Sequence, residues 1–108
     1  MPNTFKNSVV TAVGTTMVNA YVCPAATQTT AIGMTIANLN TNAITANIVL
    51  HTAGSNVHVL KNCTIPPGGA LVPIGGDQKL VLEFGDYIQV QTSAVNSADV
   101  ILSVLEIT

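Results

Sequence analysis

Residues 79–90 read KLVLEFGDYIQV. Two apolar runs, residues 79–84 and 87–92, flank a Gly-Asp pair, and such a pair is typical of a tight chain reversal. Glycine tolerates the backbone conformations of a turn, and the aspartate side chain can accept hydrogen bonds from the amides of the turn backbone. The segment therefore predicts two β-strands joined by a tight reversal at Gly85-Asp86, with Asp86 bonded to turn amides.

Strand-length runs separated by turn residues cover the rest of the chain in the same way. No helical period of 3.6 residues is sustained over a dozen positions, and the strand-favouring residues Val, Ile and Thr are abundant. The spacing of about ten residues is typical of an antiparallel sandwich or barrel, because parallel crossovers need longer connections. The expected strands are residues 8–13, 16–23, 31–39, 44–52, 56–65, 69–74, 79–84, 87–92 and 99–107.

The length of 108 residues suits one domain. We expect an all-β, antiparallel β-sandwich with a jelly-roll or immunoglobulin-like strand order, eight or nine short strands and negligible helix. The sandwich is expected to occupy residues 9–108, after an N-terminal arm at residues 1–8. Residues 53–56 (AGSN) and 66–69 (PPGG) are expected to form two further turns.

Alternation within two of the strands predicts which side chains enter the core. In residues 31–39, Ile32, Met34 and Ile36 share one face. In residues 44–52, four apolar side chains are expected to face inward: Ile44, Ala46, Ile48 and Leu50.

The last expected strand is apolar on both of its faces. Val100, Leu102 and Val104 share one face. Ile101, Leu105 and Ile107 share the other face. A strand that is apolar on both faces is normally buried on both, so the second face needs a loop, a neighbouring subunit or a host surface to cover it.

Charged residues make up only 7% of the chain, against roughly 25% in ordinary domains. With three Lys, no Arg and a net charge of −2, the surface cannot bind nucleic acid by neutralising phosphates. No window of about 18 consecutive apolar residues suggests a membrane span. Because low charge promotes association, we expect copies of the chain or a larger partner to cover much of the surface. The alternative is a Thr- and Asn-rich surface with no partner.

The two chain termini supply the candidate partner-interface residues. In the expected arm, Phe5 is an apolar anchor and Lys6 is one of the few charges. Such an arm can pair with a neighbour's strand edge, and the alternative is a frayed terminus. Ile101, Leu105 and Ile107, on the second face of the last strand, complete the candidate interface.

No constellation of residues meets the requirements of an active site, so we do not expect an enzyme. The only histidines, His51 and His58, are expected to pair across the hairpin at residues 53–56 and to point outward. This pair can serve as a pH-sensitive contact, or as two solvated or packed side chains. A zinc site needs further ligands, which are missing nearby in the sequence, so we expect no metal and no cofactor.

The two cysteines, Cys23 and Cys63, match no metal-binding or redox spacing. We expect free, buried or half-buried thiols in a reducing cytoplasm, with a single disulfide as the alternative. The first residues do not resemble a secretory signal.

Three segments of the second half follow a recognisable order: IPPGGAL at residues 65–71, the opening stretch at residues 79–90, and ADVILSVLEI at residues 98–107. In this order the chain resembles small virion structural proteins of tailed bacteriophages, cyanophages among them. The resemblance implies a β-sandwich on the virus particle, assembled in the host cytoplasm.

Within that family, a capsid decoration or cement protein fits best. Such a protein clamps neighbouring copies of the major capsid protein, and the resemblance favours a homotrimer. A neck, tail or baseplate adaptor or a fibre protein of the virion is the close alternative. A carbohydrate-binding β-sandwich module is the distant one, although the shortage of aromatic residues weakens it.

Overall fold

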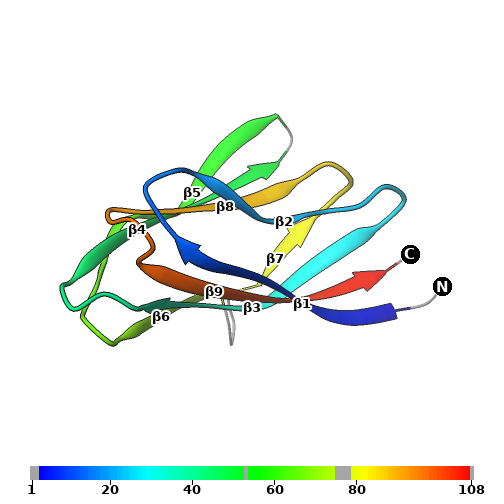
Figure 1. Ribbon diagram of the computed structural model, residues 1–108. Helices are drawn as coiled ribbons and strands as arrows, with labels where there is room; N and C mark the ends of the chain where they lie inside the picture. Colours follow the sequence, from blue (N-terminus) through cyan, green and yellow to red (C-terminus); the bar gives the residue numbers. More distant parts are fainter. Residues whose placement is uncertain (1–2, 53, 75–78, 108) are drawn as a thin grey trace.

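The computed structural model of the protein describes residues 3–52, 54–74 and 79–107 (Figure 1). These residues form an all-β domain and contain no helix, as the sequence predicts. In particular, they contain no helix long and apolar enough to cross a membrane. The strands are β1 (Asn3–Val13), β2 (Val18–Val22), β3 (Gln28–Asn38), β4 (Ile44–Thr52), β5 (Ser55–Ile65), β6 (Ala70–Ile74), β7 (Leu80–Leu82), β8 (Tyr87–Thr92) and β9 (Ala98–Ile107).

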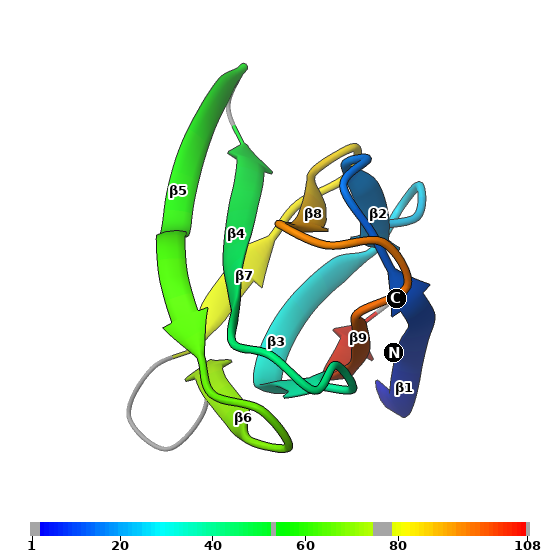
Figure 2. The ribbon, with the colours of Figure 1, turned by 60° about the vertical axis from the view of Figure 1, so that its left-hand side comes forward.

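The strands form two antiparallel sheets that pack face to face (Figures 1 and 2). The first sheet has the order β1-β9-β3-β6, and β7 pairs with β3 next to β6. The second sheet has the order β2-β8-β4-β5. In Figure 2, the tip of β5 extends past the other strands.

The strand order decides between the two expected topologies. The chain pairs β1 with β9, β2 with β8, β3 with β6 and β7, and β4 with β5, so the pairs are nested like one long hairpin wound around the core. Apart from β4–β5, strands that follow one another in the sequence do not pair with each other. This order is that of a jelly roll, whereas an immunoglobulin-like sandwich pairs several sequential neighbours.

Two expected turns are present. The amide of Gly69 donates to the carbonyl of Pro66 at 3.0 Å, and Gly68 has the positive φ of 69° that this turn needs. At Gly85, with φ 86°, the chain reverses, and the Asp86 carboxylate accepts the Glu83 amide at 3.0 Å. The reversal connects β7 and β8 in different sheets, so these strands do not form a hairpin.

The core follows the predicted alternation in β4 and β9. The four predicted side chains of β4 are buried, and Val100, Leu102 and Val104 of β9 are fully buried. The prediction for Ile32 is wrong. Ala31 pairs with Val104 and Gly33 with Ser103, so Ile32 is an extra, bulged residue. A bulge shifts the alternation, and Ile32 therefore leaves the face that it would otherwise share with the buried Met34 and Ile36.

The boundary expected after residue 8 is not present in the described chain. β1 runs from Asn3 to Val13 and pairs with β9 from Asn3↔Ile107 onward. Residues 3–8 therefore belong to the sandwich as the first part of an edge strand, and only residues 1–2 of the expected arm lie outside the described residues. The reason is non-local, because β9 offers these residues a pairing edge within their own chain.

Deleting residues 1–7 should destabilise the domain, because the deletion removes the backbone pairing of Asn3 to Asn7 with β9. In a domain of this size each kcal/mol lost lowers the melting temperature by about 4–8 °C, so a loss of several degrees is expected in thermal unfolding followed by circular dichroism. Phe5→Ala, which keeps the backbone pairing, is the matched control and should have a much smaller effect. An unchanged melting temperature after the deletion would contradict this prediction and support an N-terminal arm that is independent of the sandwich.

Candidate functional site

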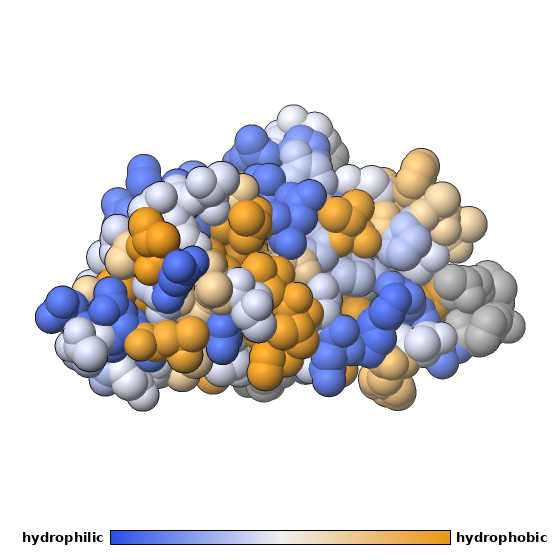
Figure 3. Space-filling view, viewed as in Figure 1, coloured by the Kyte–Doolittle hydropathy of each residue, from blue (hydrophilic) through white to orange (hydrophobic). Residues whose placement is uncertain are grey.

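The outer face of the first sheet gathers apolar side chains that water reaches. The alternation that buries Val100, Leu102 and Val104 turns Ile101, Leu105 and Ile107 to this face. We call it the apolar face, and its apolar side chains are Phe5, Val9, Ile32, Val72, Val81, Ile101, Leu105 and Ile107. In the space-filling view, hydrophobic residues reach the surface in both halves of the molecule, including the lower half, where the first sheet lies (Figure 3).

Several of these apolar side chains have a large exposed fraction. Phe5 is 72% exposed and Val81 is 64% exposed, and these two residues lie at opposite edges of the sheet. Ile101 is 48% exposed although its strand lies between β1 and β3. The loop that could have covered the second face of β9 is therefore not found among the described residues. Contiguous apolar surface of this kind marks interaction sites more often than it marks free surface.

Cross-strand register arranges the apolar face as two ridges and a furrow. The first ridge is Phe5, Leu105, Thr30 and Val81. The furrow is Asn7, Ser103 and Gly33. The second ridge is Val9, Ile101 and Thr35. None of these three rows contains a charged residue.

The furrow is hollow because its side chains are small or, at Gly33, missing. Gly33 has no side chain, and the Ser103 hydroxyl donates to Asn7 Oδ1 at 2.8 Å. The hollow has a volume of about 270 Å³, and its lining residues are Phe5, Lys6, Asn7, Ile32, Ser103 and Val104. Bulged Ile32 thus borders the hollow instead of filling the core.

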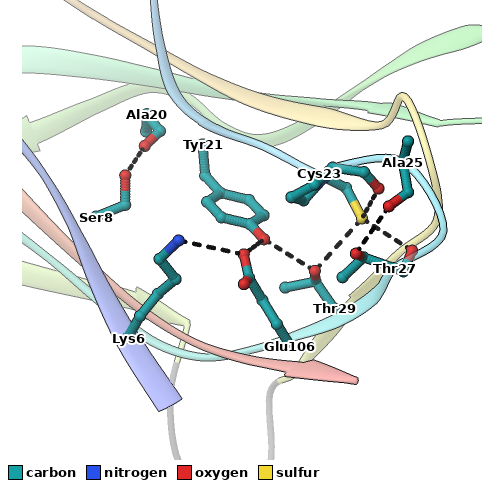
Figure 4. Close-up of polar contacts among 10 residues, drawn as sticks. Lys6, Ser8, Ala20, Tyr21, Cys23, Ala25, Thr27, Thr29 and Glu106 are labelled. Atoms are coloured by element: carbon teal, nitrogen blue, oxygen red, sulfur yellow. Dashed lines mark hydrogen bonds and ion pairs between the residues drawn. The ribbon is translucent and has the colours of Figure 1, made fainter. Parts of the chain in front are cut away.

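Lys6 does not belong to the apolar face. It pairs with Val104, whose side chain is buried, and its Nζ lies 3.7 Å from Glu106 Oε2 between the two sheets (Figure 4). Of the five predicted interface residues, Phe5, Ile101, Leu105 and Ile107 share one surface, whereas Lys6 lies on the other side of β1, and its contact with a partner stays a prediction. Alternation along β1 separates Lys6 from its neighbour Phe5.

Glu106 is the centre of a buried polar cluster at one end of the sandwich (Figure 4). The Tyr21 hydroxyl donates to Glu106 Oε2 at 2.5 Å and lies 2.9 Å from Thr29 Oγ1. Burial and the hydrogen bond to the Glu106 carboxylate raise the pKa of Tyr21 well above its ordinary value of 10. Tyr21 therefore stays neutral, and the cluster ties β1, β2, β3 and β9 together.

The outer face of the second sheet is polar and built largely of neutral side chains. Gln89 Nε2 donates to Asn19 Oδ1 at 3.1 Å, and Asn47, beside Gln91 in the register, accepts the Asn62 amide at 2.7 Å. We call this surface the amide face, and its side chains include Asn19, Asn47, Asn56, Gln89, Gln91, His51, His58 and Tyr87. The two sheets thus present surfaces of opposite character.

The expected pairing of His51 with His58 is wrong. Thr52 pairs with Ser55, so two residues rather than four connect β4 and β5, and the register shifts by two. His51 lies opposite Asn56, with its Nδ1 2.7 Å from Asn56 Oδ1, and its ring stacks on Tyr87 at 4.6 Å. His58 lies opposite Val49. Both histidines do face outward, as predicted.

The cysteines of the described chain are free thiols, with Cys23 buried and Cys63 half-buried, as the sequence predicts. No group of three or more His, Cys, Asp or Glu side chains in residues 3–52, 54–74 and 79–107 could hold a metal ion.

Comparison with known protein families finds no matching family model, and no curated protein matches the sequence.

Sequence reasoning missed Val9, Val72 and Val81 as parts of the apolar face. Val9 follows Phe5 by four residues in one strand, so alternation alone could have found it. Val81 joins the face only through its pairing with Thr30, and the sequence carries no local signal for that register.

Tyr21→Phe tests the buried cluster. Removing the hydroxyl leaves Glu106 with fewer partners, so the variant should lose about 1–3 kcal/mol in denaturant unfolding at neutral pH. The raised pKa of Tyr21 stabilises the folded state fully below pH 10, and this contribution is lost as pH rises further, because the unfolded chain ionises first. The difference from the unmodified chain should therefore shrink above pH 10.

The matched control is Tyr87→Phe, whose ring stacks on His51 on the amide face. A difference between Tyr21→Phe and the unmodified chain that stayed constant to pH 11 would contradict the role of the buried hydroxyl.

Proposed function

We propose that the chain is a structural protein of a bacteriophage particle, a capsid decoration or cement protein that works as an assembled set of copies. The observation that carries this proposal is the apolar face, a broad surface with few charges that a single chain leaves exposed. Covering such a surface is favourable, and exposed apolar patches of this kind mark interaction sites.

Two further observations support the particle. The second half of the sequence resembles small virion structural proteins of tailed phages. The jelly roll is an architecture common in viral capsid domains, although lectins and cupins share it, so the fold alone does not select the function.

The distribution of charge supports a binding mode that does not depend on ion pairs. Lys6, whose side chain is half exposed, lies 3.7 Å from Glu106, and the carboxylate of Asp99 at the end of β9 accepts the Ala12 amide at 3.0 Å. Affinity for the major capsid protein or for other copies would then come from burial of apolar area and from hydrogen bonds of neutral groups. Such contacts weaken little when salt screens exposed charges.

The first test is occupancy on purified particles of the phage that encodes the chain. We expect hundreds of copies per particle by quantitative mass spectrometry, and retention of these copies from low to moderate salt. A handful of copies would favour a neck, tail or baseplate position, and absence from the particle would overturn the proposal.

A second test uses two substitutions in central strands. Ile101→Asp places a charge on the apolar face and should reduce occupancy at least tenfold, because the ionised group would be desolvated without a partner. Gln89→Asp places the same charge on the amide face and should leave occupancy unchanged. Equal loss in both variants would show that the apolar face is not the contact.

A carbohydrate-binding module remains the second candidate, and the amide face is the observation that favours it. Planar amides fixed by their neighbours, such as Gln89 and Asn47, offer paired donors and acceptors, and the Tyr87–His51 stack adds aromatic surface. Binding of the isolated chain to a neutral glycan on an array, lost in Gln89→Ala and kept in Ile101→Asp, would favour this candidate over the first.

A further inference from the structure

We propose that the occupant of the apolar face is a second copy of the same chain, packed sheet against sheet about a twofold axis. The inference deepens the proposed function, on which it rests for the idea that this face is covered in the working state. It names the partner and the register of the contact.

The spacing of the rows makes the face complementary to itself. Successive rows lie about 7 Å apart, since residues i and i+2 of a strand are separated by two rises of about 3.3 Å. A twofold axis that runs parallel to the rows, midway between the first ridge and the furrow, places each copy's first ridge over the other copy's furrow. In that position Leu105 of one copy enters the hollow beside Ser103 of the other.

The same axis also pairs the other two apolar residues on the outer face of β9. On β9 it relates position 105 to 103 and position 107 to 101, so Ile107 of each copy packs against Ile101 of the other. The contact is therefore isologous, because residue i meets residue j and residue j meets residue i. An axis that set ridge on ridge would leave the furrows empty, and unfilled space of this kind is costly.

The polar atoms of the furrow tolerate being covered. Ser103 and Asn7 already satisfy each other through the 2.8 Å hydrogen bond. Asn7 also lies on the edge strand β1, from which its amide group can still reach water. Burying this row therefore leaves no unpaired hydroxyl at the centre of the contact.

The charge and the area also fit a second copy. The residues that the register pairs in the three rows carry no charge in either copy, so covering them desolvates no ionised group of the rows themselves, whereas an ordinary protein surface carries many charges. A fourth row, Asn3, Ile107 and Gln28, lies beyond the first ridge. Four strands about 4.8 Å apart and four rows about 7 Å apart give a footprint of about 500 Å². Because side-chain surface is rough, two copies bury more than about 1,000 Å², which is the size at which specific interfaces begin.

This register favours a twofold pair over the trimer that the resemblance implied. A closed trimer uses two different patches on each subunit, whereas ridge and furrow lie together on one face and match their own copy.

The decisive experiment is a cross-linking test of the register with the full chain. In a Cys63→Ser background, Ser103→Cys and Leu105→Cys chains carry different masses and are mixed, and a short bismaleimide joins the thiols. Packed sheets lie about 10 Å apart, which is too far for a direct disulfide. Buried Cys23 should not react.

We expect the mixture to yield mostly the mixed cross-linked dimer, with each variant alone yielding at least fivefold less. A second pair, Ile101→Cys with Ile107→Cys, should behave in the same way. Cross-linking of Leu105→Cys to itself as the main product, or a trimer mass, would overturn the proposed register.

Light scattering of the full chain gives an independent measure. We expect a dimer mass, a dissociation constant raised at least tenfold by Ile101→Asp or by Ser103→Phe, which fills the furrow, and no change in Gln89→Asp or Gln89→Phe. A monomer at high concentration would overturn the inference. A dimer that is absent from phage particles would leave the inference standing and overturn the proposed function, and occupancy of particles by a monomer would do the reverse.

Discussion

The structure depends on β9, a strand that is apolar on both faces and lies between β1 and β3 in the first sheet. Its inner face supplies three fully buried side chains to the core. Among the described residues, its outer face then has no further layer of the same chain above it, because a jelly roll has two layers. The inner face of β9 thus stabilises the fold, and its outer face leaves apolar side chains that a partner would bury.

The buried cluster around Glu106 shows how the core ends. β9 alternates apolar side chains inward as far as Val104, and the next inward position is a carboxylate. Its charge is tolerated because the Tyr21 hydroxyl donates to it and Lys6 lies beside it. The edge strand β1 is therefore anchored at its beginning by a side chain as well as by backbone pairing, and this is why the N-terminal residues are part of the domain.

Local patterns in the sequence located the strands and two of the turns. The bounds of β4 and β8, the inward side chains of β4 and the turn at Gly68 all follow from alternation and from glycine. What could not be predicted is set by distant partners. The bulge at Ile32 exists relative to β9, and the position of His51 depends on how tightly β4 and β5 are joined.

The candidate interface residues show the same distinction between local sequence patterns and pairing with distant strands. Ile101, Leu105 and Ile107 share a face by alternation within one strand, so the sequence was enough to group them. Phe5 joins them only through the pairing of β1 with β9, and Lys6 leaves the group for the same reason. Membership of a surface that crosses strands requires the register, which no single segment encodes.

The unusual composition of the chain becomes intelligible once the two outer faces are considered together. A protein with few charges must keep its working form in solution by other means, because net charge is the usual protection against association. Here the amide face supplies neutral hydrogen-bonding groups to water, and Gln89 and Asn47 are held in place by neighbours rather than left free to pair with other chains. If the apolar face is covered by a copy, the surface left to solvent is dominated by such amides and hydroxyls. Charged residues are then needed on neither side, since one face is dry and the other is solvated without them.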